Sequence, residues 1–209
     1  MELLAKLLGG SERVKIMRLF LHKENALLSA SDVALKTKTK SVLIRKELKA
    51  LLSIGFIEKK KNRIVTLVGK GKKAKPKAKE VISFTLNNEF PHNQALKDLL
   101  FDFVLLDKRE LANRFRHVGR IKMFVLSGVF IGDPKSRVDI LIVGEGIKKA
   151  KADKIIEGIS AELGRDITCS MMDAEEYEYR FKMYDKFVRD IIELPHETLI
   201  DKISQKFVA

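Results

Sequence analysis

Residues 40–57 read KSVLIRKELKALLSIGFI, and this stretch decides the fold predicted for the first part of the chain. From Ser41 to Ile54 the apolar residues recur at helical spacing, which predicts an amphipathic helix. Gly55 follows where a helix end favours a left-handed residue. The residues expected to face the core are Ile44, Leu48, Leu51 and Leu52. The polar residues on the other faces, free to meet solvent or a ligand, are Ser41, Arg45, Lys46 and Lys49.

Two shorter helices are predicted upstream of this one. Ser11–Leu21 has an amphipathic pattern, and Ser29 with Asp32 three residues later offers an N-cap for a helix that ends near Lys36. After a short break at 37–39 the longer helix follows, which is the order of a helix-turn-helix. In that motif the N-terminal residues of the last helix enter the major groove, here Thr39, Lys40, Ser41 and Arg45. On the pattern alone, an ordinary three-helix bundle remains the alternative.

A β-hairpin is predicted directly after the last helix. Residues 55–67 are typical of strands around a polar turn, and Val81–Leu86 alternates so that it can pair back as another strand. Between them, residues 69–79 hold six lysines, two glycines and a proline, which predicts a flexible wing loop. Six phosphate contacts there would steepen the salt dependence of binding by roughly 5 units. A solvated spacer is the alternative. The hairpin residues expected to meet nucleic acid are Lys60, Lys61, Arg63, Lys70, Lys72, Lys73, Lys75, Lys77 and Lys79.

The positive charge of the chain is concentrated in its first part. The formal net charge is +13, and residues 1–90 hold 21 Lys and Arg against 8 Asp and Glu. Residues 91–209 hold 20 of each sign, so they contribute no net charge. This asymmetry predicts a polyanion-binding part joined to a part with another task. A basic domain that is merely soluble would show the same charge.

Composition excludes several classes of protein. Hydrophobic residues make up 45% and charged residues 33% of the chain, as in soluble globular proteins. The apolar runs fall far short of the roughly 20 residues needed to cross a bilayer, and residues 1–6 do not resemble a signal peptide. Cys169 is the single cysteine, which excludes an internal disulfide and a multi-cysteine zinc site. We therefore expect a cytoplasmic protein without a membrane segment.

Strands and helices alternate in the second part of the chain, which predicts a small mixed sheet flanked by helices. Helices are expected at 94–105, 108–118, 148–163 and 175–194, and strands at 121–126, 138–143 and 167–171. An aromatic and apolar stripe marks the last helix as part of the core or as a dimer face; a cofactor site is the less favoured alternative. Its members are Tyr177, Phe181, Tyr184, Phe187, Val188 and Ile191.

Two segments resemble known regulators. Residues 40–57 are similar to the segment from recognition helix to wing in bacterial winged-helix regulators of the MarR/ArsR type. Residues 86–91 (LNNEFP) and 95–100 (ALKDLL) resemble the connection in those regulators that carry a C-terminal nucleotidyltransferase-like domain. The resemblance implies an α+β protein with two domains, a winged helix-turn-helix at 1–90 and a nucleotidyltransferase-like domain at 91–209.

Residues 126–132 (LSGVFIG) and 137–144 (RVDILIVG) resemble the core motif of the polymerase-β-type nucleotidyltransferases. Active members hold triphosphate on a Gly-Ser turn and two Mg²⁺ ions on a strand with two carboxylates separated by one residue. Here Val129 replaces the serine after Gly128, and Arg137 replaces the first carboxylate, so Asp139 is alone. A guanidinium repels a cation, and the third strand, 167–171, has no acid. We therefore expect an inactive domain without a metal or cofactor.

Other roles for this degenerate motif stay open. The backbone at Gly128 and Gly132, with Arg137, could bind phosphate, or the glycines could simply form a tight turn. Asp139 could cap a backbone segment or pair with a lysine, and Asp166 or Asp173 could be a displaced third carboxylate.

The leading hypothesis is a sequence-specific, double-stranded-DNA-binding transcriptional regulator. Its second domain is expected to form a homodimer or to sense a small-molecule or nucleotide effector. One alternative is a Mg²⁺-dependent nucleotidyltransferase that the basic part recruits to nucleic acid. Another is an RNA-binding adaptor, against which the scarcity of aromatic side chains in residues 37–79 argues.

Overall fold

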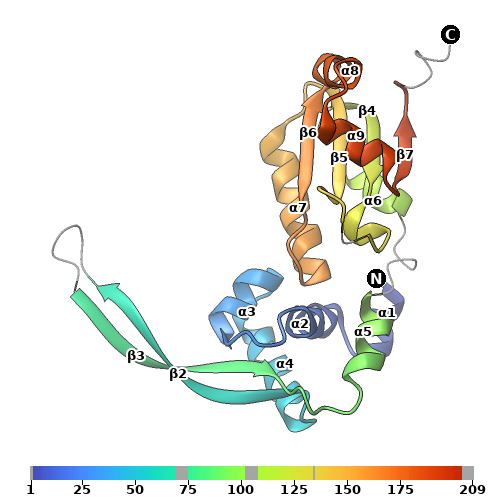
Figure 1. The fold of residues 1–209 in the computed structure, drawn as a ribbon. Coiled ribbons are helices and arrows are strands. Elements are labelled where there is room, and N and C mark those ends of the chain that lie inside the picture. The colour runs from blue at the N-terminus through green and yellow to red at the C-terminus, as the bar shows by residue number, and fades with distance from the viewer. Residues whose placement is uncertain (1, 69–74, 102–107, 134, 204–209) are drawn as a thin grey trace. The chain divides into compact units, whose positions relative to one another are not determined.

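The computed structural model describes residues 2–68, 75–101, 108–133 and 135–203 and shows an α+β protein with two small sheets (Figure 1). The chain divides into two compact units. The first contains Met1–Phe101 with Ala161–Arg165, and the second contains Asp102–Ser160 with Asp166–Ala209. This division falls after Phe101, whereas the predicted boundary lies at residue 90. Helix α5 (Asn93–Phe101) belongs to the first unit because its Leu100 is buried in that unit's core.

Four helices precede the first long strand in the first unit. They are α1 (Glu2–Leu8), α2 (Ser11–His22), α3 (Ala30–Thr37) and α4 (Ser41–Ser53). The three predicted helices are confirmed within one or two residues, whereas α1 was not predicted. Ser29 begins α3 with a capping box: its Oγ accepts from the Asp32 N–H (3.2 Å), and the Asp32 carboxylate accepts from the Ser29 N–H (2.8 Å). This reciprocal pair satisfies two donors that the first helical turn leaves open.

Local backbone conformation places α4 relative to α3. Lys38 adopts a left-handed conformation (φ 50°) at the end of α3, and the Thr39 N–H donates to the Ala34 carbonyl. Gly55 (φ 76°) follows the end of α4, as predicted. The stripe on α4 faces the core: Ile44, Leu48 and Leu51 are buried, and Leu52 packs against them. They meet buried residues of α2 such as Phe20, so that core packing fixes which side of α4 remains exposed.

The first sheet is antiparallel, with strand order β1-β3-β2. Its strands are β1 (Leu28–Ser29), β2 (Ile57–Val68) and β3 (Lys75–Leu86), and β2 and β3 pair along their whole length. The predicted polar turn within 55–67 is wrong, because β2 runs through it without a break. Residues 75–79, predicted as loop, belong to β3, and 69–74 lie outside the described residues. A two-stranded ribbon does not require one buried face, so a polar composition does not exclude a strand.

The second sheet has strand order β6-β5-β4-β7. Its strands are β4 (Arg120–Leu126), β5 (Ile140–Glu145), β6 (Cys169–Asp173) and β7 (Glu197–Asp201). The β5–β6 pair is parallel and the other two pairs are antiparallel, so the predicted small mixed sheet is observed. Strand β7 was not predicted. Its backbone pairs with β4, which lies more than seventy residues earlier in the chain. No local sequence pattern predicts a pairing over that distance.

Helices cover both faces of this sheet. Met123 and Val125 of β4 lie in a core with residues of α8 (Ala174–Lys182) and α9 (Lys186–Glu193). Phe124, which points to the opposite face, contacts Phe115 with ring centroids 5.3 Å apart. Phe115 directly follows α6 (Lys108–Arg114). Helix α7 (Lys149–Leu163) connects β5 to β6.

The predicted single helix at 175–194 is wrong, because it is broken between α8 and α9. Tyr184 adopts φ 54°, and Asp185 caps α9 by accepting from the Val188 N–H (3.1 Å). The break lets Tyr177 and Val188 reach the same core while Tyr184 stays 74% exposed. The aromatic stripe is therefore divided between the core and the surface.

Across the described ranges, no helix combines the length and the apolar character needed to span a membrane.

Candidate nucleic-acid interface

The exposed face of α4 carries one group of the side chains predicted to meet nucleic acid. Arg45, Lys46 and Lys49 are exposed, together with Ser41 in the first turn and Lys40 just before it. The helix places them on the sides that its buried stripe leaves open. Thr39 differs from the others: it is half-buried, and its hydroxyl donates to the Thr37 carbonyl at 3.2 Å. Its observed contact is therefore with the turn before α4.

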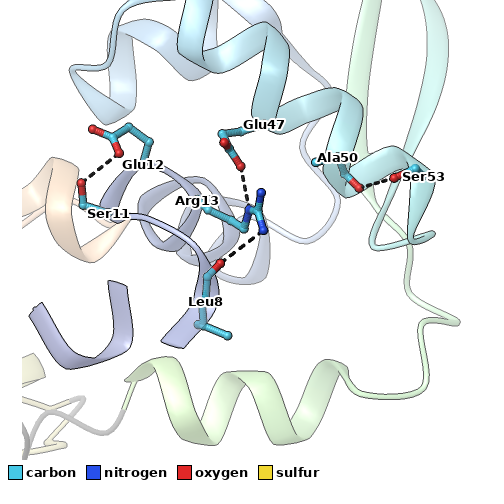
Figure 2. Close-up of polar contacts among 7 residues, drawn as sticks. All are labelled: Leu8, Ser11, Glu12, Arg13, Glu47, Ala50 and Ser53. Atoms are coloured by element: carbon cyan, nitrogen blue, oxygen red, sulfur yellow. Dashed lines mark hydrogen bonds and ion pairs between the residues drawn. The ribbon is translucent and has the colours of Figure 1, made fainter. Parts of the chain in front are cut away.

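The acidic residue of α4 is turned away from this exposed face. Glu47 is the only acid in Ser41–Ser53, all of which the structure describes. Its Oε2 accepts from Nε of Arg13 on α2 (Figure 2). The two atoms are 2.6 Å apart, and the Glu47 side chain is only 11% exposed. Nη1 of Arg13 also donates to the Leu8 carbonyl at 3.3 Å. The pair joins α4 to α2, so the only charged side chains on the outer face of α4 are cations.

Apolar side chains lie next to these cations. Val42 of α4 is 79% exposed and Leu43 is 40% exposed, while Leu35 of α3 is 78% exposed. Sequence reasoning did not single them out, although all three fall outside the stripes that face the core. An exposed valine in the first turn of a groove-binding helix could contact the methyl group of thymine.

The hairpin supplies further cations. Lys59, Lys60 and Lys61 of β2 are exposed, and Nζ of Lys60 lies 3.5 Å from Oε2 of Glu58. Both side chains of that pair are about half exposed, so the contact contributes little to stability. The side chains of Arg63, Lys75, Lys77 and Lys79 lie outside the described part, as do Lys70, Lys72 and Lys73 altogether. Helix α4 and the first part of β2 therefore both carry exposed cations, and both belong to the first unit.

The degenerate motif of the second unit forms a different kind of arrangement. Asp139 is 9% exposed, and each of its carboxylate oxygens accepts a backbone hydrogen bond. The Val129 N–H donates to Oδ1 (2.9 Å) and the Thr168 N–H donates to Oδ2 (2.8 Å). Asp139 thus joins the 3₁₀ turn Gly128–Phe130 to the segment that enters β6. Of the roles left open by the sequence, the structure shows backbone capping.

The two glycines of the motif meet different surroundings. Gly128 has φ 54°, and a Cβ there would lie 2.3 Å from Oδ1 of Asp139. Gly132 has φ 73°, and a Cβ there would meet nothing within 4 Å. Gly128 is therefore required by the approach of the Asp139 carboxylate as well as by its backbone conformation.

Arg137 and the acids near the third strand also have identified positions. Nε of Arg137 lies 2.6 Å from Oδ2 of Asp190 on α9, so the guanidinium is engaged in an ion pair. Asp173 immediately precedes α8, and Asp166 lies in the loop before β6. Within the described residues, no three His, Cys, Asp or Glu side chains come together as a metal site would require.

Two ionisable groups of the second unit have raised pKa values. Burial, reinforced by the charges of Asp153 and Asp139, raises the pKa of the Cys169 thiol to about 12. Burial, with a smaller contribution from Asp201, raises the pKa of Tyr177 to about 12 as well. A thiol held in its protonated form is a poor nucleophile, so Cys169 is suited to packing.

Comparison with known proteins adds no assignment to this geometry: no protein-family model, no curated protein and no solved structure matches the chain.

Proposed function

We propose that the chain is a sequence-specific, double-stranded-DNA-binding transcriptional regulator of the winged helix-turn-helix type. In this proposal α3 and α4 form the helix-turn-helix, α4 is the recognition helix, and the β2–β3 hairpin is the wing. The observation that carries the proposal is the division of α4 into two faces. Ile44 and Leu48 are buried, Glu47 is paired inward, and the outer face carries Arg45, Lys46 and Lys49.

The order and pairing of the elements support this proposal. A helix, a left-handed turn at Lys38 and a second helix are followed by an antiparallel hairpin, and the short β1 strand before α3 pairs with β3. Because β1 pairs with β3, the start of α3 is tied to the base of the hairpin. Each strand of the hairpin spans 12 residues, which corresponds to about 40 Å of extended chain. A hairpin of this length could follow a phosphate backbone beyond the reach of α4.

The exposed groups on α4 suit the two kinds of contact that duplex DNA offers. Arg45 and the lysines can bind phosphate or the acceptors of guanine in the major groove. Ser41 can donate to either, and Val42 offers an apolar contact for a thymine methyl group. The mixture of cationic, hydroxyl and apolar groups in the first turns favours base recognition over purely electrostatic binding.

The second unit is proposed to dimerise the protein or to sense an effector. Helix-turn-helix proteins commonly bind two half-sites as two-fold dimers. Exposed aromatic and apolar side chains at the corner between α8 and α9 are candidates for such a contact, and they are Tyr179, Phe181, Met183 and Tyr184.

The proposal is tested by selecting bound duplexes from a random-sequence library with the full-length protein across a salt series. We expect a short two-fold motif to be enriched. Arg45→Ala/Lys49→Ala should lose the motif, weaken binding at least tenfold and lower the salt slope by about 1.8 if each cation contacts one phosphate. Lys151→Ala/Lys154→Ala, which removes two exposed cations of α7, is the matched control.

Two results would count against the proposal. Binding without a motif that is equal in the wild type and in Arg45→Ala/Lys49→Ala would remove α4 from the interface. Tighter binding to single-stranded RNA than to duplex DNA at the same salt concentration would favour an RNA-binding adaptor instead.

A further inference from the structure

A basic groove lies in the second unit beside α6 and β7, away from the degenerate motif. Its cavity has a volume of about 1070 Å³. The charged residues that line it are Lys108, Arg109, Arg116, Arg120, Lys202 and Glu197. Gly128, Arg137 and Asp139 are not among the lining residues. The groove is therefore a feature separate from the arrangement around Asp139.

The groove concentrates positive charge within a neutral part of the sequence. Five cations and one acid line it, although residues 91–209 carry equal numbers of each sign. Glu197 pairs with Lys108 and so neutralises that lysine. Among the described residues, Arg116 and Lys202 have no side-chain partner, and both are exposed. Cations gathered in a concave site raise the local potential, which attracts anions.

Arg120 is only loosely held by its acidic neighbour. Its Nη1 lies 3.7 Å from Oε2 of Glu145, its side chain is 81% exposed, and Lys122 also pairs with Glu145. A second cavity of about 280 Å³ shares Arg120, Ile121 and Lys202 with the groove, and its lining adds one cation, Lys122, and one acid, Glu178. Arg120 and Lys202 therefore stand where the two cavities meet. An anion placed there would gain charge-assisted hydrogen bonds without first breaking a buried ion pair.

The lining of the groove also has an apolar part. Ile121 is buried, and Leu199 and Ile200 of β7 are half-buried along the same cavity. Ligand pockets for small molecules typically measure about 300–1,000 Å³ and combine apolar walls with a few polar anchors. The volume, at the upper limit of this range, and the mixed lining suit a ligand that has an apolar group and several negative charges.

We propose that this groove binds a nucleotide-sized polyphosphate ligand, with Arg116, Arg120 and Lys202 at the phosphates and Leu199 and Ile200 beside the base. Phosphates of this kind can come from a free nucleoside triphosphate or from the backbone of a nucleic acid strand. The apolar wall favours the free nucleotide. The site does not depend on the proposed DNA interface, because none of the α4 or hairpin residues contributes to it.

The test measures fluorescence anisotropy of an N-methylanthraniloyl-ATP probe with the full-length protein at low salt. Wild type is expected to bind the probe, and Arg116→Glu/Lys202→Glu to bind it at least tenfold more weakly. The matched control, Lys151→Glu/Lys154→Glu, makes the same change of charge on α7 and should bind as wild type does. Arg116→Gln/Lys202→Gln introduces no acid and should show a smaller loss of probe affinity. This variant replaces Arg116→Glu/Lys202→Glu in the test if the charge-reversed variant does not fold.

Competitors distinguish the two sources of phosphate. Unlabelled ATP should displace the probe best if the ligand is a free nucleotide, whereas an eight-residue oligothymidylate should do so if it is a nucleic acid strand. Inorganic tripolyphosphate should compete in both cases because the phosphates are the shared element. Arg45→Ala/Lys49→Ala should keep probe binding, which separates this site from the DNA interface. The proposal is overturned if wild type does not bind the probe, or if the folded groove variants bind it as tightly as the α7 control does.

Discussion

Replacement of Asp139 by alanine tests whether this residue serves the fold or is the remnant of a metal site. In the structure its two oxygens accept from the N–H groups of Val129 and Thr168. Loss of the carboxylate would leave both donors without this partner. Loss of one ligand from an otherwise unused metal site would instead leave the free energy of unfolding unchanged or slightly higher.

The two hydrogen bonds contribute unequally. The Val129 N–H is buried, so the loss of its charged acceptor should cost about 1.5–3 kcal/mol. The hydrogen bond from the Thr168 N–H is only partly buried, so this loss should cost less, about 0.5–1 kcal/mol. Asp139→Ala should therefore lower the free energy of unfolding of the second unit by about 2–4 kcal/mol. Asp139→Asn keeps one acceptor oxygen and should lose roughly half of that.

Gly128→Ala and Gly132→Ala provide a matched pair for the same arrangement. Both glycines have positive φ, so each alanine costs about 1–2 kcal/mol in backbone strain. At Gly128 the new methyl group would also lie 2.3 Å from the Asp139 carboxylate, whereas at Gly132 it would meet open space. Gly128→Ala should therefore destabilise the second unit clearly more than Gly132→Ala does.

Tyrosine fluorescence during urea denaturation can follow the second unit alone. The chain has no Trp, and its three tyrosines, Tyr177, Tyr179 and Tyr184, all lie in that unit. The reasoning is refuted if Asp139→Ala shifts the free energy of unfolding by less than about 0.5 kcal/mol, or if the two glycine variants are equally stable.

Two further predictions concern groups that the structure removes at least partly from solvent. Glu47→Ala should destabilise the first unit by about 1.5–3 kcal/mol, because it leaves Arg13 without its charged acceptor. Far-UV circular dichroism during urea denaturation measures this loss. A double-mutant cycle with Arg13→Ala should give a coupling energy above about 0.5 kcal/mol, and additive effects of the two substitutions would contradict the prediction. Cys169 should react with iodoacetamide at pH 8 about a thousandfold more slowly in the folded than in the unfolded chain, because its pKa is raised to about 12. Because the folded protein holds this proton more tightly than the unfolded chain does, the contribution of Cys169 to stability is complete below about pH 8.5 and falls as the pH rises toward 12. Equal rates of alkylation in the two states would show that the thiol is not protected.

Sequence reasoning succeeded where the signal is local. The capping box at Ser29, the stripe of α4 and the glycine after it each lie within a few residues along the chain, and helices obey such short-range rules. The same reasoning failed for residues 175–194. The periodic pattern of apolar residues continues across the break between α8 and α9, so the pattern predicts one helix. The break itself arises because Tyr177 and Val188 both pack into the core of the second unit.

The strands of the second sheet at 121–126, 138–143 and 167–171 were predicted within about two residues, whereas the strand predictions for the hairpin failed for a related reason. Lysine-rich segments were assigned to a turn and a loop, although the backbone of β2 and β3 pairs through most of them. Backbone hydrogen bonds between strands do not depend on side-chain charge. A prediction from composition therefore misses strands in a hairpin whose side chains are polar and solvated. Strand β7 was missed because its partner β4 is distant in sequence.

The sequence by itself determined helices α2, α3 and α4 of the first unit, the concentration of positive charge in residues 1–90 and the exposed face of α4, since periodicity and composition are properties of neighbouring residues. Only the tertiary structure decided that Glu47 pairs inward with Arg13 and that Asp139 holds two backbone segments together. It also decided that Arg116 and Lys202 line one groove, although 86 positions separate them. Each of these arrangements depends on contacts that form only when distant segments pack, and no spacing along the chain encodes them.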